Sequence, residues 1–211
     1  MQSRTIRSLL PFPLLSLIVV LCGCSGRPTP PARPGLDASG ASAKAMEMYD
    51  KNGDNQLDAE ERKASPALEL AMETMDDNND GMLSRAEIKQ RIEEWQNADS
   101  IINTQGVEVY RNGQPVEGAT VTLVPEEFLQ PTIQVTTGVT DAHGFAFPEG
   151  QNAKYPGIYL GLYRVEISKK EDGRETIPAK FNSETTLAIE AAPDAPSSQR
   201  LFVFDLGSQP R

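Results

Sequence analysis

The sequence has few of the residues on which common catalytic and metal sites depend. Its 211 residues contain two cysteines, Cys22 and Cys24, and a single histidine, His143. Because both cysteines lie near the N-terminus, a disulfide framework, a thiolate zinc site and a catalytic cysteine are excluded from the body of the chain. Basic residues are also scarce, since 20 Lys and Arg stand against 30 Asp and Glu, a net charge of −10. A nucleic-acid partner, which requires a basic face, is therefore not expected.

The single histidine does not suggest catalysis. His143 follows Asp141 in a stretch that is typical of a turn. A catalytic or metal-binding histidine needs an orienting partner and a nucleophile or metal within reach, and the sequence indicates neither. We therefore expect a surface turn here and a protein that is not an enzyme. A cleft joining His143 to acidic residues of another strand would favour the opposite interpretation.

The N-terminal segment is typical of an export signal. Two arginines precede an apolar run from Leu9 to Leu21, which is shorter than the ~20 residues that span a bilayer. The run ends in Leu21-Cys22-Gly23-Cys24-Ser25, which resembles a bacterial lipobox with Cys24 as the first residue of the mature chain. The resemblance implies a signal peptide over residues 1–23. It also implies acyl chains such as palmitate on Cys24, which would hold the protein on a membrane.

The segment after the lipobox is expected to be a stalk. Residues 24–36 are rich in proline and contain no apolar run, so they cannot form a core and favour an extended chain. Ser25 resembles the pattern of outer-membrane lipoproteins in Gram-negative bacteria, and we expect an extracytoplasmic position in the cell envelope. Acylation at Cys22, a plain transmembrane anchor and a secretory peptide with a chance cysteine are the alternatives.

Two 12-residue segments, 50–61 and 76–87, match the spacing of the EF-hand calcium loop, with oxygen donors at positions 1, 3, 5, 9 and 12. Calcium takes six to eight oxygen ligands, which closely spaced carboxylates and amides supply. The predicted ligands of the first loop are Asp50, Asn52, Asp54, the Gln56 carbonyl, Asp58 and Glu61. Those of the second loop are Asp76, Asn78, Asp80, the Met82 carbonyl, Ser84 through water, and Glu87. Two bound Ca²⁺ ions are therefore expected.

Positions 6 and 8 of the loops indicate how each loop turns and how the two loops pair. Position 6 needs a sharp turn, often with positive φ, which Gly81 supplies without strain, whereas Asn55 stands there in the first loop. We therefore expect the first loop to bind calcium less tightly. Leu57 and Leu83 occupy position 8, where paired EF-hands join their loops by a short β-bridge.

The flanks of the loops are expected to be helical. Apolar residues recur at helical spacing weakly before the first loop, and clearly on both sides of the second. They are Ala45, Met46 and Tyr49, then Ala67, Leu68, Ala71, Met72 and Met75 after Pro66, and finally Ile88, Ile92 and Trp95. The loops begin only 26 residues apart, so the first exiting helix must be short and end near residues 64–66. We predict an EF-hand pair over residues 37–99. A dockerin, which usually has Asp at position 12 and lacks an entering helix, and acidic turns without metal are the alternatives.

The C-terminal half changes to a period of two, which favours strands. Strands are expected around residues 107–109, 116–124, 133–140, 145–147, 159–167, 186–191 and 201–206, with a tight hairpin at Asn112-Gly113. Short strands separated by turn signals predict an antiparallel, Ig-like β-sandwich. The fold class is therefore α+β in two domains.

Several stretches of this half resemble carboxypeptidase regulatory-like, or transthyretin-like, domains over about residues 104–207. They are Asn112 to Val121, Thr140 to Phe145, Pro156 to Ile167 and Ile177 to Ser183. The order of lipobox, calcium loops and this domain is similar to small lipoproteins of planctomycete-type bacteria. Domains of this kind are accessory modules without a shared active site, so the resemblance implies a fold and an interaction role but no catalytic residues.

These features together predict a membrane-anchored, extracytoplasmic calcium-binding lipoprotein. Calcium would be mainly structural, and its removal would destabilise residues 37–99 while leaving the β-sandwich, the interaction module, largely intact. The alternative is a cell-surface adhesion module that binds a polysaccharide or a protein and has dockerin-like calcium loops. Tyr155, Tyr159 and Tyr163, spaced at i, i+4 and i+8, would form its exposed aromatic row, unless they pack in the core.

Overall fold

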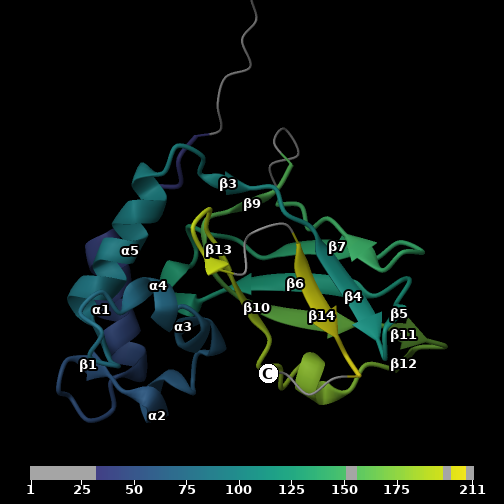
Figure 1. Cartoon of the computed structure of the whole chain (residues 1–211), viewed down its shortest axis with the longest axis horizontal. Helices are drawn as coiled ribbons and strands as arrows, with labels where there is room; N and C mark the ends of the chain where they lie inside the picture. Colours follow the sequence, from purple (N-terminus) through teal and green to yellow (C-terminus); the bar gives the residue numbers. More distant parts are fainter. Residues whose placement is uncertain (1–31, 151–155, 197–200, 208–211) are drawn as a thin grey trace, which may run out of the picture. The chain divides into compact units, whose positions relative to one another are not determined.

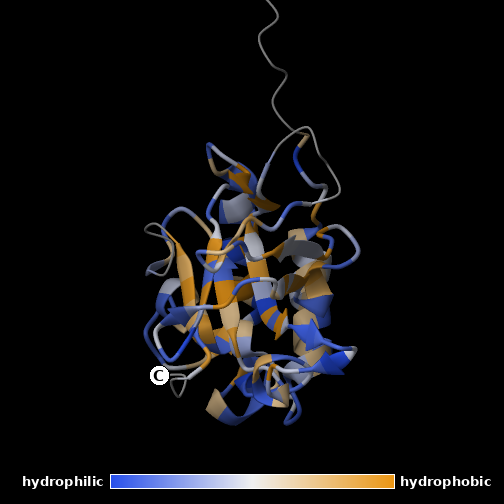
Figure 2. Cartoon of the chain, turned by 90° about the vertical axis from the view of Figure 1, so that its right-hand side faces the viewer, coloured by the Kyte–Doolittle hydropathy of each residue, from blue (hydrophilic) through white to orange (hydrophobic). Residues whose placement is uncertain are grey.

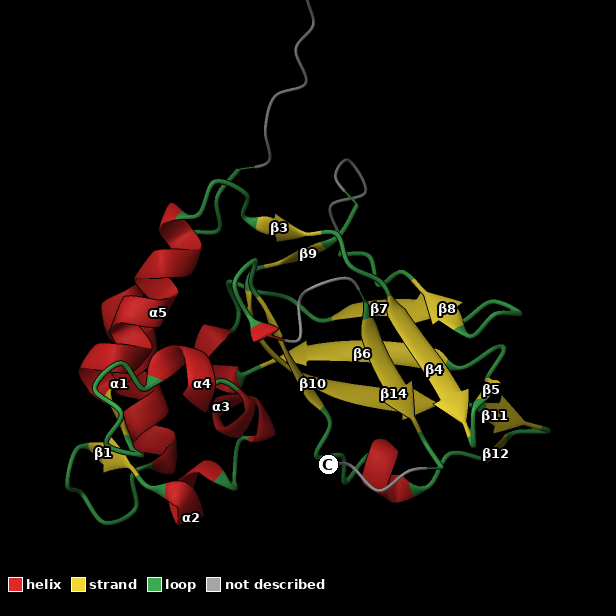
Figure 3. Cartoon of the chain, viewed as in Figure 1, coloured by secondary structure: helices red, strands yellow, loops and turns green. Residues whose placement is uncertain are grey.

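The computed structural model describes residues 32–150, 156–196 and 201–207. These residues belong to one compact unit, in which the α-helices lie on one side and the larger β-sheets on the other (Figures 1 and 3). The predicted signal peptide, Cys24 and Tyr155 lie outside the described residues, as do residues 24–31 of the predicted stalk. None of the helices in the described part of the chain is long and apolar enough to cross a membrane.

The helical part contains five short helices that surround the two predicted loops. They are α1 (Ala38–Tyr49), α2 (Ala59–Arg62), α3 (Pro66–Leu70), α4 (Met72–Met75) and α5 (Arg85–Asn97). The first exiting helix, α2, is a single turn, which confirms the short helix expected from the loop spacing. The helix expected before the second loop is divided at Ala71, whose backbone (φ −83°, ψ 3°) leaves the helical region.

Side-chain caps set where α1, α2, α3 and α5 begin, whereas α4 has no such cap. The Asp37 carboxylate accepts a hydrogen bond from the backbone N–H of Ser39 at 3.1 Å, and Ser65 accepts one from Leu68 ahead of Pro66. The apolar faces expected from the spacing are buried in the helical core, with Met72 half-buried at its edge. The buried members are Ala45, Met46, Tyr49, Ala67, Leu68, Ala71, Met75, Ile88, Ile92 and Trp95.

The strands form two four-stranded sheets and small two-stranded ribbons. One sheet has the order β13-β10-β6-β7, and in the other β14, β4 and β5 follow one another while β8 pairs with β4. The bounds are β4 (Val107–Arg111), β5 (Gln114–Pro115), β6 (Thr120–Pro125), β7 (Thr136–Val139), β8 (Phe145–Ala146), β10 (Gly161–Ser168), β13 (Ala188–Ala191) and β14 (Phe202–Asp205). The ribbons are β3 (Ile102–Asn103) with β9 (Ile158–Tyr159), and β11 (Lys170–Glu171) with β12 (Arg174–Glu175). The expected long strand over residues 159–167 is thus divided, and β3, β11 and β12 were not predicted.

The hairpin between β4 and β5 confirms the turn expected at Asn112-Gly113. Both residues have positive φ, 53° and 75°, as a two-residue turn of this kind requires. The prediction of a fully antiparallel sandwich is wrong in one place, because β14 pairs with β4 in parallel, with Val203 opposite Glu108. Parallel neighbours need a long connection, and here most of the strand region lies between the two strands in sequence.

Alternate residues of the central strands fill the hydrophobic core. Val107 and Val109 of β4, Val121 and Leu123 of β6, and Val165 of β10 are all buried. Hydrophobic residues accordingly concentrate along the strands, whereas most loops are hydrophilic (Figure 2), and the helices contribute buried hydrophobic residues to the same core. Burial of one face of each strand is the physical reason for the period of two in the sequence.

A buried carboxylate on β13 connects the strands to the helices. Glu190 is 1% exposed, and its Oε1 accepts hydrogen bonds from Arg91 Nε at 2.7 Å and Trp95 Nε1 at 3.3 Å. Its Oε2 accepts a hydrogen bond from Thr74 Oγ1 at 2.7 Å. Thr74 lies on α4 and the other two donors lie on α5, so one carboxylate holds the helices on both sides of the second loop.

Arg91 has a second acidic partner in the strand region. Its two terminal nitrogens donate to the Asp194 carboxylate at 2.8 and 2.9 Å. These hydrogen bonds lower the pKa of the Asp194 carboxyl below its ordinary value. The buried guanidinium is therefore paired on both sides, as a buried charge requires.

We expect Arg91→Met to lower the free energy of unfolding by about 3–5 kcal/mol, because the substitution leaves the Glu190 charge buried without its cationic partner. The control is Lys89→Met on the same helix, which breaks the exposed ion pair of Lys89 with Glu93 and should cost at most ~0.5 kcal/mol. Urea unfolding of both variants measures the difference, and equal effects would contradict the assigned role of Arg91.

Candidate metal centre

Each predicted calcium loop lies between two helices. The first loop connects α1 to α2 and the second connects α4 to α5. In the middle of each loop a two-residue strand, β1 (Gln56–Leu57) or β2 (Leu83–Ser84), pairs with the other in antiparallel fashion. Leu57 stands opposite Leu83 and both side chains are fully buried, which confirms the expected bridge between the loops.

In the second loop, side chains of predicted ligands hold the backbone in its turn. The Asp76 carboxylate accepts hydrogen bonds from the backbone N–H groups of Asp80 at 3.1 Å and Gly81 at 2.9 Å. The Asn78 side-chain oxygen accepts from Asp80 N–H at 2.8 Å, and one Asp80 oxygen accepts from Met82 N–H at 2.9 Å. Such side-chain-to-backbone bonds are typical of Asx turns, and they fold the loop before any ion is considered.

The first loop repeats this arrangement. Asp50 accepts a hydrogen bond from the N–H of Asn55 at 2.9 Å, Asn52 accepts from Asp54 at 2.8 Å, and Asp54 accepts from Gln56 at 2.9 Å. The predicted donors at positions 1, 3 and 5 therefore have the same local roles in both loops. The two loops are therefore alike in their backbone geometry as well as in their sequence pattern.

Positive φ angles occur at two positions of each loop. At position 6, Asn55 has φ 66° and Gly81 has φ 82°, which confirms the turn expected there. At position 4, Gly53 has φ 78° and Asn79 has φ 59°, a requirement that sequence reasoning missed although glycine and asparagine are its usual signal.

The residues at positions 9 and 12 also cap the helices that follow the loops. Asp58 and Glu61 form a capping box at the start of α2, and Ser84 and Glu87 form one at the start of α5. The Glu87 Oε2 accepts hydrogen bonds from both the N–H and the hydroxyl of Ser84 at 2.8 Å. Sequence reasoning assigned these residues only as ligands, although their S/D-x-x-E spacing is also a capping signal.

The two position-12 carboxylates differ in their remaining oxygen. Glu87 Oε1 is buried and has no hydrogen-bond partner among the described residues, which leaves a charged acceptor desolvated. Glu61 Oε1 instead accepts hydrogen bonds from the N–H groups of Lys51 at 2.7 Å and Asn52 at 3.1 Å. A cation beside Glu87 would compensate its unpaired oxygen, so the second loop fits a hard metal ion better than the first.

The acidic side chains of the described residues do not form a compact cluster of metal ligands. Within the described chain, no three His, Cys, Asp or Glu side chains are grouped closely enough to hold a metal ion by themselves. The predicted donor sets also contain amide, hydroxyl and carbonyl oxygens. The loops therefore have the backbone turns of a calcium site, whereas the complete ligand sets stay a prediction.

The end of α1 next to the first loop is connected to the strand region. Tyr49, which directly precedes Asp50, donates its hydroxyl proton to Glu126 at 2.9 Å and contacts Phe128 edge-on at 6.5 Å between ring centroids. Glu126 is buried, and this burial raises the pKa of its carboxyl. The entering helix of the first loop is thereby fixed to the segment that directly follows β6, whereas α4 and α5 are fixed to β13 through Glu190.

The other candidate residues are not brought into a site. His143 lies in an exposed turn, as expected, 3.7 Å from Asp141. The Asp141 carboxylate accepts hydrogen bonds from the backbone N–H groups of Phe145 and His143, which lower its pKa. Tyr163 is fully buried and donates its hydroxyl proton to the Tyr159 carbonyl at 2.7 Å, so the two described tyrosines do not form an exposed aromatic row.

We expect Gly81→Ala to lower the free energy of unfolding by about 1 kcal/mol, because a non-glycine residue is strained at φ 82°. An added Cβ would meet no atom within 4 Å there, so the backbone angle alone is tested. Gly35→Ala is the control, since its Cβ would be equally free and its φ is not in the strained range. Urea unfolding in the presence of a chelator measures both, and an unchanged Gly81→Ala variant would contradict the turn.

Comparison with known proteins agrees with this geometry. A family model described as EF hand matches residues 43–61 and 68–92, which include both loops and much of their flanking helices. No curated protein and no solved structure gives a significant match to the chain. The match implies that the helical part of the protein binds calcium.

Proposed function

We propose that this protein is a lipid-anchored, extracytoplasmic protein that binds two Ca²⁺ ions and uses them to stabilise its fold. The observation that supports calcium binding most directly is the buried, unpaired Oε1 of Glu87 at the end of a loop with EF-hand turns. The proposal takes the second loop as the stronger site, because Glu61 in the first loop already uses both carboxylate oxygens.

The proposed ligands are the oxygen donors that the spacing predicts. In the second loop they are Asp76, Asn78, Asp80, the Met82 carbonyl, Ser84 and Glu87, and in the first loop Asp50, Asn52, Asp54, the Gln56 carbonyl, Asp58 and Glu61. A bound ion supplies positive charge that offsets the repulsion between these carboxylates. The backbone turns already held by Asp50 and Asp76 reduce the ordering that binding requires.

A structural role for calcium is supported by the fixed helices. Sensor EF-hands open their helix pair when calcium binds. Here α4 and α5 both bind the buried Glu190, and α1 binds Glu126 through Tyr49. Opening either loop would separate these buried polar contacts, which is costly. Extracellular EF-hand modules bind calcium at roughly 10⁻⁴–10⁻³ M and stay loaded, which is consistent with a stabilising ion.

The strand region is proposed to be a transthyretin-like sandwich that acts as an interaction module without catalysis. Its two four-stranded sheets and its buried alternate residues support a sandwich. A polysaccharide-binding role loses its main support because Tyr163 is in the core. We therefore propose that the strand region interacts with a protein at the cell surface.

We expect isothermal titration of the full-length chain in detergent to give two calcium sites, and Glu87→Gln to remove the tighter one. The amide can replace the bonds that cap α5 but lacks the charge that a calcium ligand at position 12 supplies. Glu93→Gln, an exposed change on the same helix, is the matched control and should leave both sites intact. No calcium binding by the unmodified chain would refute the proposal.

The anchor is tested separately by Cys24→Ser, which removes the proposed acylation site. In a bacterial host we expect this chain to leave the membrane fraction and to lose labelling by a palmitate analogue. Cys22→Ser is the matched control and should stay acylated. Loss of the label with Cys22→Ser alone would move the anchor to Cys22.

A further inference from the structure

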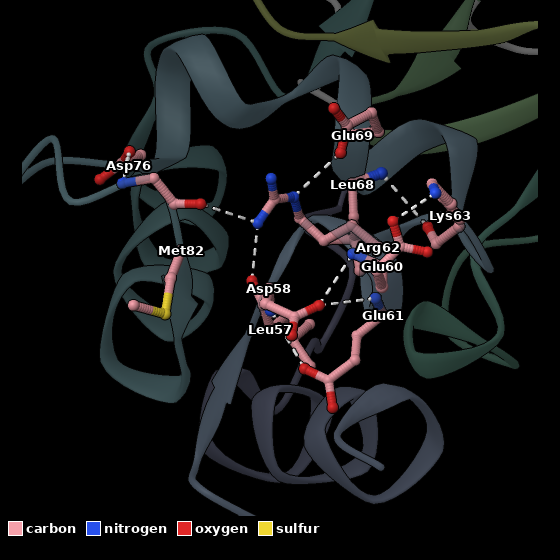
Figure 4. A network of polar contacts seen from close by, with 12 residues as sticks. Leu57, Asp58, Glu60, Glu61, Arg62, Lys63, Leu68, Glu69, Asp76 and Met82 are labelled. Carbon is pink, nitrogen blue, oxygen red and sulfur yellow. Dashed lines mark hydrogen bonds and ion pairs between the residues drawn. The ribbon is translucent and has the colours of Figure 1, made fainter. Parts of the chain in front are cut away.

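Arg62 lies between the two calcium loops. It is the last residue of α2 and directly follows Glu61, the predicted position-12 ligand of the first loop. Its side chain is only 4% exposed although it carries a positive charge. Figure 4 shows its guanidinium group pointing from α2 toward the second loop. A buried arginine has to be paired with acceptors, and its acceptors identify what it holds.

One nitrogen of Arg62 bonds to both loops. Nη1 donates to the Leu57 carbonyl at 2.7 Å in the first loop (Figure 4). It also donates to the Gly81 carbonyl at 3.1 Å in the second loop. Nε donates to the exposed Glu69 carboxylate at 3.0 Å. Hydrogen bonds from a charged donor are stronger than those between neutral groups, so the bridge between the loops is a substantial contact.

The bond to Gly81 fixes a peptide next to a predicted ligand. The Gly81 carbonyl and the Met82 N–H belong to the same peptide plane, and the N–H donates to Asp80 at 2.9 Å. Arg62 therefore holds one end of this plane from α2, and Asp80 holds the other end from within the second loop. The next carbonyl along the chain, that of Met82, is the predicted backbone ligand at position 7.

The other end of the bridge depends on the first loop. Glu61 accepts hydrogen bonds from the first loop's own backbone, at Lys51 and Asn52. Because α2 is a single turn, Glu61 and Arg62 are part of one rigid segment. An ion that changes the hydrogen bonds of Glu61 would therefore also shift Arg62, which holds the second loop.

We propose that Arg62 is a positioning residue that couples the two calcium loops, so that an ion in the first loop raises the affinity of the second. This proposal depends on the calcium binding proposed above. The β1–β2 pair also connects the loops by backbone pairing of Leu57 with Leu83, and the Arg62 side chain contacts this pair at the Leu57 carbonyl. Substitution of Arg62 removes its side-chain hydrogen bonds to Leu57 and Gly81 and leaves the β1–β2 backbone pairing as the remaining connection.

The test is a double-mutant cycle on the full-length chain with Ca²⁺ as the only added ligand. Trp95 is the single tryptophan and lies on α5, which leaves the second loop, so its fluorescence reports that loop. Glu61→Gln disables the first loop and should weaken the second about tenfold, a typical coupling strength. In the Arg62→Met background, Glu61→Gln should change the affinity of the second loop by less than about twofold.

Two further variants control for charge and folding. Glu69→Gln removes only the exposed ion pair and should keep the full coupling. Arg62→Lys keeps a buried cation but lacks the planar fork, and should lose most of the coupling while the chain stays folded. Thermal unfolding of each variant in the presence of a chelator measures the stability of the metal-free chain.

The outcomes are distinct. A tenfold effect of Glu61→Gln in the unmodified, Arg62→Met and Arg62→Lys backgrounds alike would overturn the role of Arg62 and leave calcium binding intact. Absence of any Trp95 response to calcium in the unmodified chain, together with no heat of binding, would overturn the calcium sites and the coupling with them.

Discussion

The buried carboxylate of Glu190 is the contact on which the arrangement of the helical part depends. It comes from a strand near the end of the chain, yet it accepts hydrogen bonds from the helices on both sides of the second loop. Removing it would leave Arg91 without a buried acceptor, and removing Arg91 would leave a buried negative charge. Strand β13 therefore holds both helices that flank the second loop.

This constraint determines what calcium can do in the molecule. In a switching EF-hand, binding energy is spent on moving helices apart. Here the helices are held to the strand region through Glu190 and Glu126, so under the proposed function the free energy of calcium binding would add to the stability of the folded state. From the sequence, we expected the removal of calcium to leave the strand region largely intact. The shared buried contacts lead to the opposite expectation, that the helical and strand regions unfold together.

The calcium loops, their flanking helices and the Asn112-Gly113 hairpin were predictable because each depends on a few neighbouring residues. The oxygen donors recur within twelve residues, and a positive φ at Asn55 follows from its place in the loop. The contacts of Glu190 and Arg62 were not predictable in this way. Arg91 and Glu190 are 99 residues apart, and a glutamate in a strand pattern is ordinarily assigned to the surface. The parallel pairing of β14 with β4 likewise depends on how distant strands meet, which no local pattern encodes.

The most direct test of this account is thermal unfolding of the full-length chain, with calcium and with a chelator, followed by two probes. Trp95 fluorescence reports the helical part, and circular dichroism at a wavelength dominated by strands reports the rest. The account predicts that the two curves coincide and that the chelator moves both to lower temperature. A chelator that moves only the Trp95 curve would contradict the structural connection through Glu190, and one that moves neither would contradict a stabilising role for calcium.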